Sequence, residues 1–505
     1  MRKIVWTILI MLPLCVKAQS GGILHGNCTP DIANAQTTRG GQRHLPTPNA
    51  SWDPERIYRQ AVVLFSFADK DFSMENPREF YDSIFNMSGY NKGVGPGCVA
   101  DYFREQSGGL LNLQFDVYGP YKITRNAKSG SSPNYGYEDI KEATKLWLAE
   151  DTLRQYRDYD WNDDKYLDQV IYINAGYAGN QSSDVCKGCI WPNTSSMSNH
   201  QTPDGFMVQH YSCSAELTTS NRSWGIGTIC HEFSHSLGLP DIYPTATGAG
   251  YSMVDEWDLM DGGNFTNGGW CPPNYSGLER WLMGWQTPEE LTEPASIRNM
   301  KPLSEGGPVY MVSHTDDEYY LLENRQWTRW DARLPGRGLV VFHVVYNASK
   351  WRSNMVNNTK TQRGYQLVHA DSLDYDAWDA IIGGKNPYVS GHNRYLSTSA
   401  YPWTTDSTDF VNDQLTDTST PPSLMYDNNE AGSKYLSKAI TNIRVSDDGL
   451  VSFDFMGGDL ARVSPIEEWH DKGDAPWYSL QGHRLSSEPL RKGLYIRNGR
   501  LVSKH

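Results

Sequence analysis

Two histidines and a glutamate are spaced so that they can bind a metal ion and use it. The segment reads His231-Glu232-Phe233-Ser234-His235-Ser236-Leu237-Gly238-Leu239-Pro240-Asp241. On a helix, residues four apart lie one turn apart on the same face, so His231 and His235 can grip one Zn²⁺ ion. Gly238 can end the helix in the left-handed conformation, and Asp241 can then offer a third, anionic ligand. Three protein ligands leave one position for water, and Glu232 is placed to move a proton from that water to a leaving amine.

Chance rarely produces this pattern. With 13 His and 59 acidic residues in 505, HExxH is expected roughly 0.02 times per chain, and roughly 0.002 times with the glycine included. Ile229, Phe233 and Leu237 form one apolar stripe, and the two histidines lie on the opposite side of the same helix. The alternative, a buried helix with incidental histidines, gives no reason for this separation.

The elements that must position this helix are of the α/β type. Apolar runs at 61–67, 112–117 and 169–175 predict strands, and helical spacing predicts a helix over 138–153. From about residue 290 the runs are short and separated by turn residues, at 309–312, 319–322, 338–344 and 365–368. A closing hairpin is predicted from 440–445 and 450–455. We therefore predict an α/β domain with a twisted sheet and an active-site helix, followed by a β-rich, sandwich-like domain.

The first residues predict export. Arg2 and Lys3 precede the apolar run 4–16, and the small residue Ala18 stands before Gln19, which is the layout of a secretory signal. We predict a signal peptide at 1–18, an arm or pro-segment at 19–56, the catalytic domain at 57–290, the β-rich domain at 291–456 and a small module at 457–505. No later segment is predicted to span a membrane. The net charge of -14 argues against nucleic acid as a partner.

Seven cysteines remain after the signal peptide, so at least one thiol has no partner within the chain. The spacing Cys186-Lys187-Gly188-Cys189 is found in redox and zinc-ribbon sites, but a second CxxC is missing. A structural disulfide is the interpretation that we favour for this pair.

The chain resembles the M6 family of peptidases, the immune inhibitor A type, over most of residues 57–456, with a metzincin-type motif. The matching segments are the zinc motif with Leu237-Gly238-Leu239-Pro240-Asp241, the Met-turn-like Trp257-Asp258-Leu259-Met260-Asp261-Gly262-Gly263, and Val99-Ala100-Asp101-Tyr102-Phe103. The resemblance implies zinc ligands at His231, His235 and Asp241, a catalytic Glu232, and Met260 as the floor under the metal. It implies a secreted endopeptidase acting on protein or peptide substrates.

Two further segments leave alternatives open. Asp160, Asn162, Asp164 and Asp168 stand at positions 1, 3, 5 and 9 of a calcium-loop pattern, but Lys165 replaces the usual glycine. The loop either binds Ca²⁺ or is a solvated turn. The C-terminal module resembles sorting-like modules of secreted Bacteroidetes proteins, which would engage bacterial secretion machinery, or it is a small β appendage. For the whole chain, the alternative function is a non-catalytic surface binding or adhesion protein, but a retained Glu232 argues against this.

Overall fold

The computed structural model describes residues 52–93, 95–130, 133–151, 153–181, 183–246, 252–374, 396–404, 411–459, 477–480, 485, 487–497 and 500–504. The predicted signal peptide and nearly all of the predicted arm lie outside these residues. Among the described helices, none combines the length and the apolar character needed to cross a membrane.

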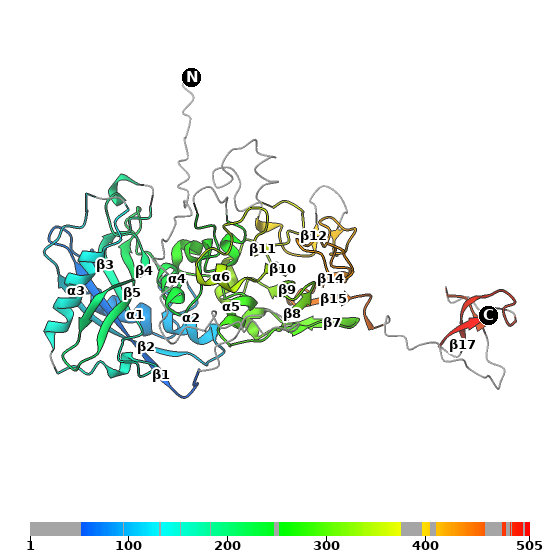
Figure 1. Ribbon diagram of the computed structural model, residues 1–505, viewed down its shortest axis with the longest axis horizontal. Coiled ribbons are helices and arrows are strands. Elements are labelled where there is room, and N and C mark those ends of the chain that lie inside the picture. Colours follow the sequence, from blue (N-terminus) through cyan, green and yellow to red (C-terminus); the bar gives the residue numbers. More distant parts are fainter. Residues whose placement is uncertain are drawn as a thin grey trace, which may run out of the picture.

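Five strands form the first sheet, in the order β2-β1-β3-β5-β4 (Figure 1). The strands are β1 (Ile57–Ser66), β2 (Asn112–Lys122), β3 (Val170–Tyr177), β4 (Asn193–Gln201) and β5 (Met207–Leu217). β1, β2, β3 and β5 run parallel, and β4 pairs antiparallel with β5. β4 therefore forms one edge of the sheet.

Helices cover both faces of this sheet, which explains the unbroken apolar run of β1. Val62 and Leu64 point to one face, where they share an apolar cluster with α1, α2 and α4. Ala61, Val63 and Phe65 point to the other face and share a second cluster with α3. The helices are α1 (Pro77–Asn86), α2 (Val99–Gln106), α3 (Tyr137–Glu150) and α4 (Gly227–Ser236).

The chain after residue 288 is mainly β. One sheet has the order β11-β10-β9-β8-β6 and another the order β14-β15-β7, and β12 pairs with β13. Their bounds are β6 (Glu289–Glu290), β7 (Ala295–Met300), β8 (Val309–Ser313), β9 (Glu318–Arg325), β10 (Gly338–Val345), β11 (Tyr365–Leu367), β12 (Trp403–Thr404), β13 (Val411–Asn412), β14 (Ile440–Val445) and β15 (Val451–Phe455). Two short helices, α5 (Gly277–Leu282) and α6 (Ala348–Arg352), accompany these strands. Leu322 of β9 and Phe453 of β15 lie in one apolar cluster, so the two sheets share a core.

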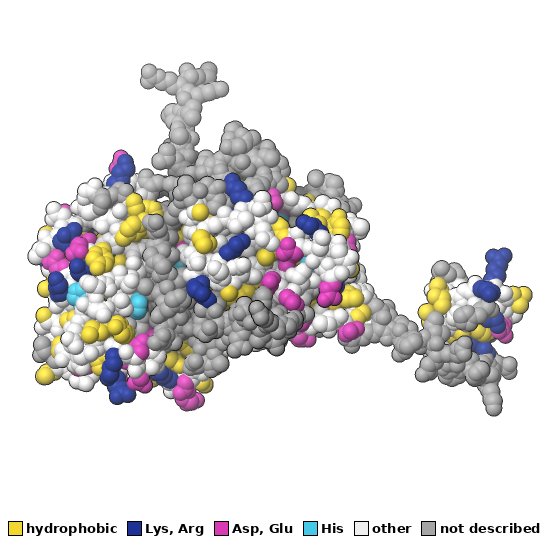
Figure 2. Space-filling view, viewed as in Figure 1, with side chains coloured by type: hydrophobic (Ala, Val, Ile, Leu, Met, Phe, Trp, Pro, Cys, Tyr) yellow, Lys and Arg dark blue, Asp and Glu magenta, His cyan; other side chains and the backbone are white. Residues whose placement is uncertain are grey.

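The first sheet with its helices and the β-rich part of the chain share one apolar core. The cluster that contains Phe233 of α4 also contains Trp257, Val340 and Phe342, the last two on β10. At the C-terminal end, β16 (Trp477–Tyr478), β17 (Gly493–Arg497) and β18 (Arg500–Lys504) form a three-stranded antiparallel sheet. On the face drawn in Figure 2, acidic and basic side chains are interspersed.

The predicted strands and the hairpin at 440–455 are confirmed, and so is the helix at 138–153, which ends earlier, at Glu150. The disulfide interpretation of the CxxC pair is wrong for this structure, because Cys186 and Cys189 are buried free thiols. The segment closes as a turn in which Cys189 N donates to Cys186 O at 3.0 Å, and the Cys189 thiol lies 3.5 Å from Val185 O. The other described cysteines, at 98, 213, 230 and 271, are also free.

Candidate metal centre

Helix α4 is held by its apolar stripe. Ile229 and Phe233 are buried in the first cluster, and the Phe233 ring packs edge-on against Phe103 of α2 at 4.9 Å between centroids. At its start, a Cβ on Gly227 would lie 2.0 Å from Asn264 O, so only glycine permits this approach. After its last residue, Gly238 has φ of +107°, the left-handed turn predicted from the sequence. The turn sends the chain back toward the two histidines.

Three side chains converge behind this turn. Asp241 Oδ1 lies 3.3 Å from His231 Nε2 and 3.1 Å from His235 Nε2. Ligands about 2.0–2.1 Å from a tetrahedral Zn²⁺ ion are separated by roughly 3.3–3.4 Å. In the described part of the chain, these residues are the one group of three His, Cys, Asp or Glu whose ligand atoms lie within 4.8 Å of one another. The two distances from Asp241 Oδ1 fit edges of a zinc coordination tetrahedron.

Backbone carbonyls orient both imidazoles. His231 Nδ1 lies 2.8 Å from Leu259 O, and His235 Nδ1 lies 2.8 Å from Leu239 O. An Nδ1–H that donates to a carbonyl leaves the Nε2 lone pair free to bind a cation. Leu259 belongs to the Met-turn-like segment, so this segment fixes the orientation of one of the two histidines.

The buried atoms of the site fit a cation. His235 Nε2 and Asp241 Oδ1 are buried, and neither has a hydrogen-bond partner within the described residues. Without a metal, burial alone would lower the pKa of His235, but the Asp241 carboxylate raises it to about 9. Burial alone would raise the pKa of Asp241, but His235 and His231 outweigh it and lower the pKa below its ordinary value. The carboxylate is therefore charged and available to a cation, and two imidazoles with one carboxylate are a donor set that suits Zn²⁺.

Glu232 lies beside this group without belonging to it. Its side chain is buried, and the Thr194 hydroxyl lies 2.9 Å from Oε2 and 2.7 Å from the Glu232 carbonyl oxygen. Burial raises the pKa of Glu232, and the two histidines partly offset this rise. A cavity of about 20 Å³, lined by His231, Glu232, Thr228 and Tyr243 among others, is large enough for a water molecule.

The Met-turn-like segment packs against the loop that carries Asp241. Met260 is fully buried, and its carbonyl accepts a hydrogen bond from Ile242 N at 2.8 Å. Asp258 Oδ1 accepts from Met260 N at 2.8 Å, which closes the turn. The role of Met260 as the floor under a metal stays a prediction.

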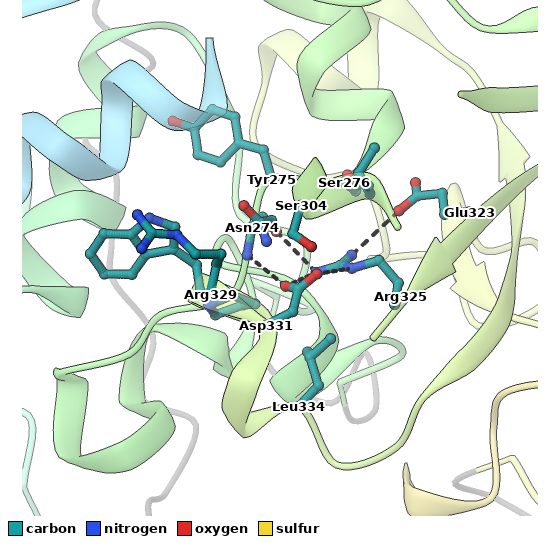
Figure 3. Close-up of polar contacts among 12 residues, drawn as sticks. Asn274, Tyr275, Ser276, Ser304, Glu323, Arg325, Arg329, Asp331 and Leu334 are labelled. Carbon is teal, nitrogen blue, oxygen red and sulfur yellow. Dashed lines mark hydrogen bonds and ion pairs between the residues drawn. The ribbon is translucent and has the colours of Figure 1, made fainter. Parts of the chain in front are cut away.

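A buried ion-pair cluster supports α4 from the β-rich part (Figure 3). Arg325 of β9 donates to both oxygens of Asp331, at 2.8 and 2.7 Å, and lies 3.3 Å from Glu323. All three side chains are fully buried. Asp331 accepts from Asn274 N at 2.9 Å. The hydroxyl of the next residue, Tyr275, is hydrogen-bonded to the Ser234 hydroxyl on α4.

The predicted calcium loop is closed by its own side chains. Asp160 accepts from Asp164 N at 3.1 Å and from Lys165 N at 2.9 Å. Asn162 Oδ1 also accepts from Asp164 N at 3.1 Å, and Asp168 accepts from Trp161 N at 2.5 Å. The carboxylates are not among the convergent groups of the described residues. Calcium binding here stays a prediction from the sequence.

Two site contacts were missed from the sequence. Thr194 contacts Glu232 across 38 residues, and Asn354 donates to Asp241 Oδ2 at 2.7 Å across 113 residues. Thr194 carries no local sign of this role. Asn354 belongs to the asparagine-rich stretch 354–358 after α6, which is a signal, but not a specific one.

Known metallopeptidases are similar in sequence to part of this chain. Residues 47–283 match the family model "Immune inhibitor A peptidase M6, catalytic domain". The chain is 23% identical over 280 residues to the pre-pro-metalloprotease PrtV of Vibrio cholerae, and 26% identical over 267 residues to immune inhibitor A of Bacillus thuringiensis subsp. alesti. It is 23% identical over 425 residues to a protein of Arthroderma benhamiae whose name includes the words secreted metallopeptidase. These matches cover 49%, 43% and 71% of this chain, but 29%, 38% and 60% of the relatives. Residues 47–283 are thus similar to the catalytic domain of M6 peptidases, and two of the relatives carry the words metalloprotease or metallopeptidase in their names.

Proposed function

We propose that this protein is a secreted zinc-dependent endopeptidase. The observation that carries the proposal is the convergence of His231 Nε2, His235 Nε2 and Asp241 Oδ1 within 4.8 Å of one another, with Glu232 beside them. The donors are buried, both imidazoles contact carbonyls and Asp241 accepts from Asn354, so the group is organised before any ion binds.

The roles of the side chains follow from their positions. His231, His235 and Asp241 would hold the Zn²⁺ ion, which when bound polarises a peptide carbonyl and acidifies water. Glu232 accepts a proton from the attacking water and passes it to the leaving amine. Thr194 holds the Glu232 carboxylate in place for both transfers. The raised pKa of Glu232 suits a group that must take and then release a proton.

Strand β4 suggests how a substrate binds. It is an edge strand of the sheet, and Thr194 near its start contacts Glu232. An extended peptide can pair with an edge strand through backbone hydrogen bonds. Such pairing is independent of the substrate's termini, which supports cleavage within a protein chain.

The predicted signal peptide and the names of the relatives support export. In this proposal the arm at 19–56 is either a pro-segment that is removed on activation or a segment that only packs against the enzyme. The module at 457–505 either engages secretion machinery or is a small β appendage. A Ca²⁺ ion at loop 160–168 remains part of the proposal only on sequence grounds.

Metal content and proteolysis test the proposal together. Purified protein should contain one Zn²⁺ ion per chain and cleave casein, lose cleavage with a chelator and recover it with Zn²⁺. Glu232→Gln preserves the shape of the side chain, so it should keep the metal and lose at least about 10²-fold in kcat. A protein that binds zinc but leaves casein and a peptide library intact would instead support the adhesion alternative.

A further inference from the structure

Asp241 uses its two carboxylate oxygens differently. Oδ1 faces the two histidines, whereas Oδ2 accepts a hydrogen bond from Asn354 Nδ2 at 2.7 Å. The same amide accepts from Asp241 N through its Oδ1, at 2.6 Å. Asp241 is fully buried and Asn354 is 6% exposed. One asparagine therefore grips both the backbone and the side chain of one proposed metal ligand.

The backbone at Asn354 is shaped for this contact. Asn354 follows α6 and has φ of +55°, a left-handed conformation that asparagine adopts more readily than most residues. Its neighbours hold the same loop: Asn357 donates to Ile242 O at 2.7 Å, and Ala246 N donates to Asn358 at 3.0 Å. We call Asn354, Asn357 and Asn358 the asparagine clamp.

The clamp lies outside the part of the chain that matches the catalytic-domain model, which ends at residue 283. A neutral amide that holds Oδ2 leaves Oδ1 as the oxygen that faces the histidines. It also adds no charge that would repel a cation. A carboxylate that is fixed before binding loses less conformational freedom when it takes an ion.

We propose that Asn354 is a positioning residue that fixes Asp241 as a metal ligand, so that the β-rich part of the chain completes the metal site. The inference rests on the proposed function in one respect, that Asp241 binds the metal. Asn354 is not one of the proposed metal ligands and acts through its contacts with Asp241.

Zinc affinity, measured on the full chain by competition with a chromogenic chelator, tests the inference. Asn354→Gly keeps the left-handed backbone and removes the amide, and it should lower zinc affinity by roughly 10–100-fold. Asn354→Asp, which is nearly isosteric, turns the donor into an acceptor and should also weaken binding. Asn442→Gly is the matched control, because Asn442 has φ of +54° and donates instead to Asp454 in the β14–β15 hairpin. Its zinc affinity should equal that of the wild type.

A double-mutant cycle separates positioning from general destabilisation. In an Asp241→His background the carboxylate that Asn354 holds is gone, so Asn354→Gly should cost much less affinity there than in the wild type. Equal losses in both backgrounds, or wild-type affinity in both Asn354 variants, would overturn the inference. If the wild type itself bound no zinc, the proposed function would fail first. Thermal melting of each apo-protein checks that the variants fold.

Discussion

The Thr194 hydroxyl, on edge strand β4, lies 2.9 Å from Oε2 of Glu232 on helix α4. The same hydroxyl lies 2.7 Å from the Glu232 carbonyl oxygen, so its single proton can point to either the carboxylate or the carbonyl of this residue. Thr194 and Glu232 are both buried, so this contact is shielded from water.

Thr194→Val removes the hydroxyl and leaves the shape of the side chain nearly unchanged. We expect kcat/KM for a peptide substrate to fall roughly 10–100-fold. The physical reason is that a hydrogen bond to a charged group is worth about 1.5–3 kcal/mol. Thr194→Ser retains the donor and should stay near wild type. Zinc content should be unchanged in both variants, and a Val variant with full activity would show that Glu232 needs no support from β4.

Asp241 should behave as a ligand of the metal. Asp241→Ala removes one of three protein donors, so zinc affinity should fall by more than the roughly 10–100-fold typical of a residue that only orients a ligand. Asp241→His should recover part of the affinity, because imidazole also binds Zn²⁺. Zinc titration of both variants makes the comparison. Near-normal affinity in the Ala variant would place the third ligand elsewhere, with Asp255, Glu256 and Asp258 as the next positions to test.

Calcium should raise the melting temperature of the wild type more than that of Asp164→Ala, if the sequence pattern at 160–168 describes a cation site. An ion that binds only the folded state stabilises it by about 2.7 kcal/mol at a hundred times its Kd. Asp158→Ala is the control, because Asp158 lies in the same loop region but outside the pattern and is 59% exposed. Identical shifts in all three proteins, or none, would identify the loop as a turn closed by its own side chains.

Stability should fall as pH rises because of Asp261. Burial, together with the nearby Asp255 and Asp258, raises the pKa of Asp261 to about 8, whereas an unfolded Asp titrates near about 3.9. The folded state therefore holds a proton that the unfolded state releases. This contribution is fully present below about pH 4 and is lost as pH rises through about 8.

Asp261→Asn should flatten this part of the pH profile, and calorimetric melting of the metal-free protein between pH 4.5 and 8.5 is the measurement. In the wild type, Asp255 N lies 3.0 Å from Asp261 Oδ2, and the Ser252 hydroxyl contacts Asp261 Oδ1. An Asn at position 261 can accept from Asp255 N with its side-chain oxygen and donate to the Ser252 hydroxyl with its amide. The same slope in wild type and variant would assign the pH dependence to other groups.

Local pattern predicted much of this structure. The apolar run in β1, the stripe on α4 and the left-handed turn at Gly238 each follow from residues within a dozen positions of one another. Boundaries were less accurate: β2 continues to Lys122, past Gly119 and Pro120, because an edge strand tolerates a proline that a central strand would not.

The contacts that complete the candidate site could not be predicted in this way. Thr194 and Asn354 reach their partners across 38 and 113 residues, and neither residue type is diagnostic of its role. The buried Arg325–Asp331 pair was missed for the same reason, since an Arg and an Asp six residues apart are usually exposed. Such contacts depend on how the sheets and loops pack together, which periodicity does not encode.

Asn354 lies 113 residues after Asp241, so during synthesis the metal ligands are made before the residue that positions one of them. A chain synthesised from its N-terminus presents both histidines and the carboxylate well before α6 and the asparagine clamp exist. Until then the Oδ2 oxygen of Asp241 lacks its asparagine partner, so we expect an unfinished or truncated chain to bind the metal more weakly. The cell that makes this protein would thereby be shielded from its proposed proteolytic activity until synthesis has passed residue 358.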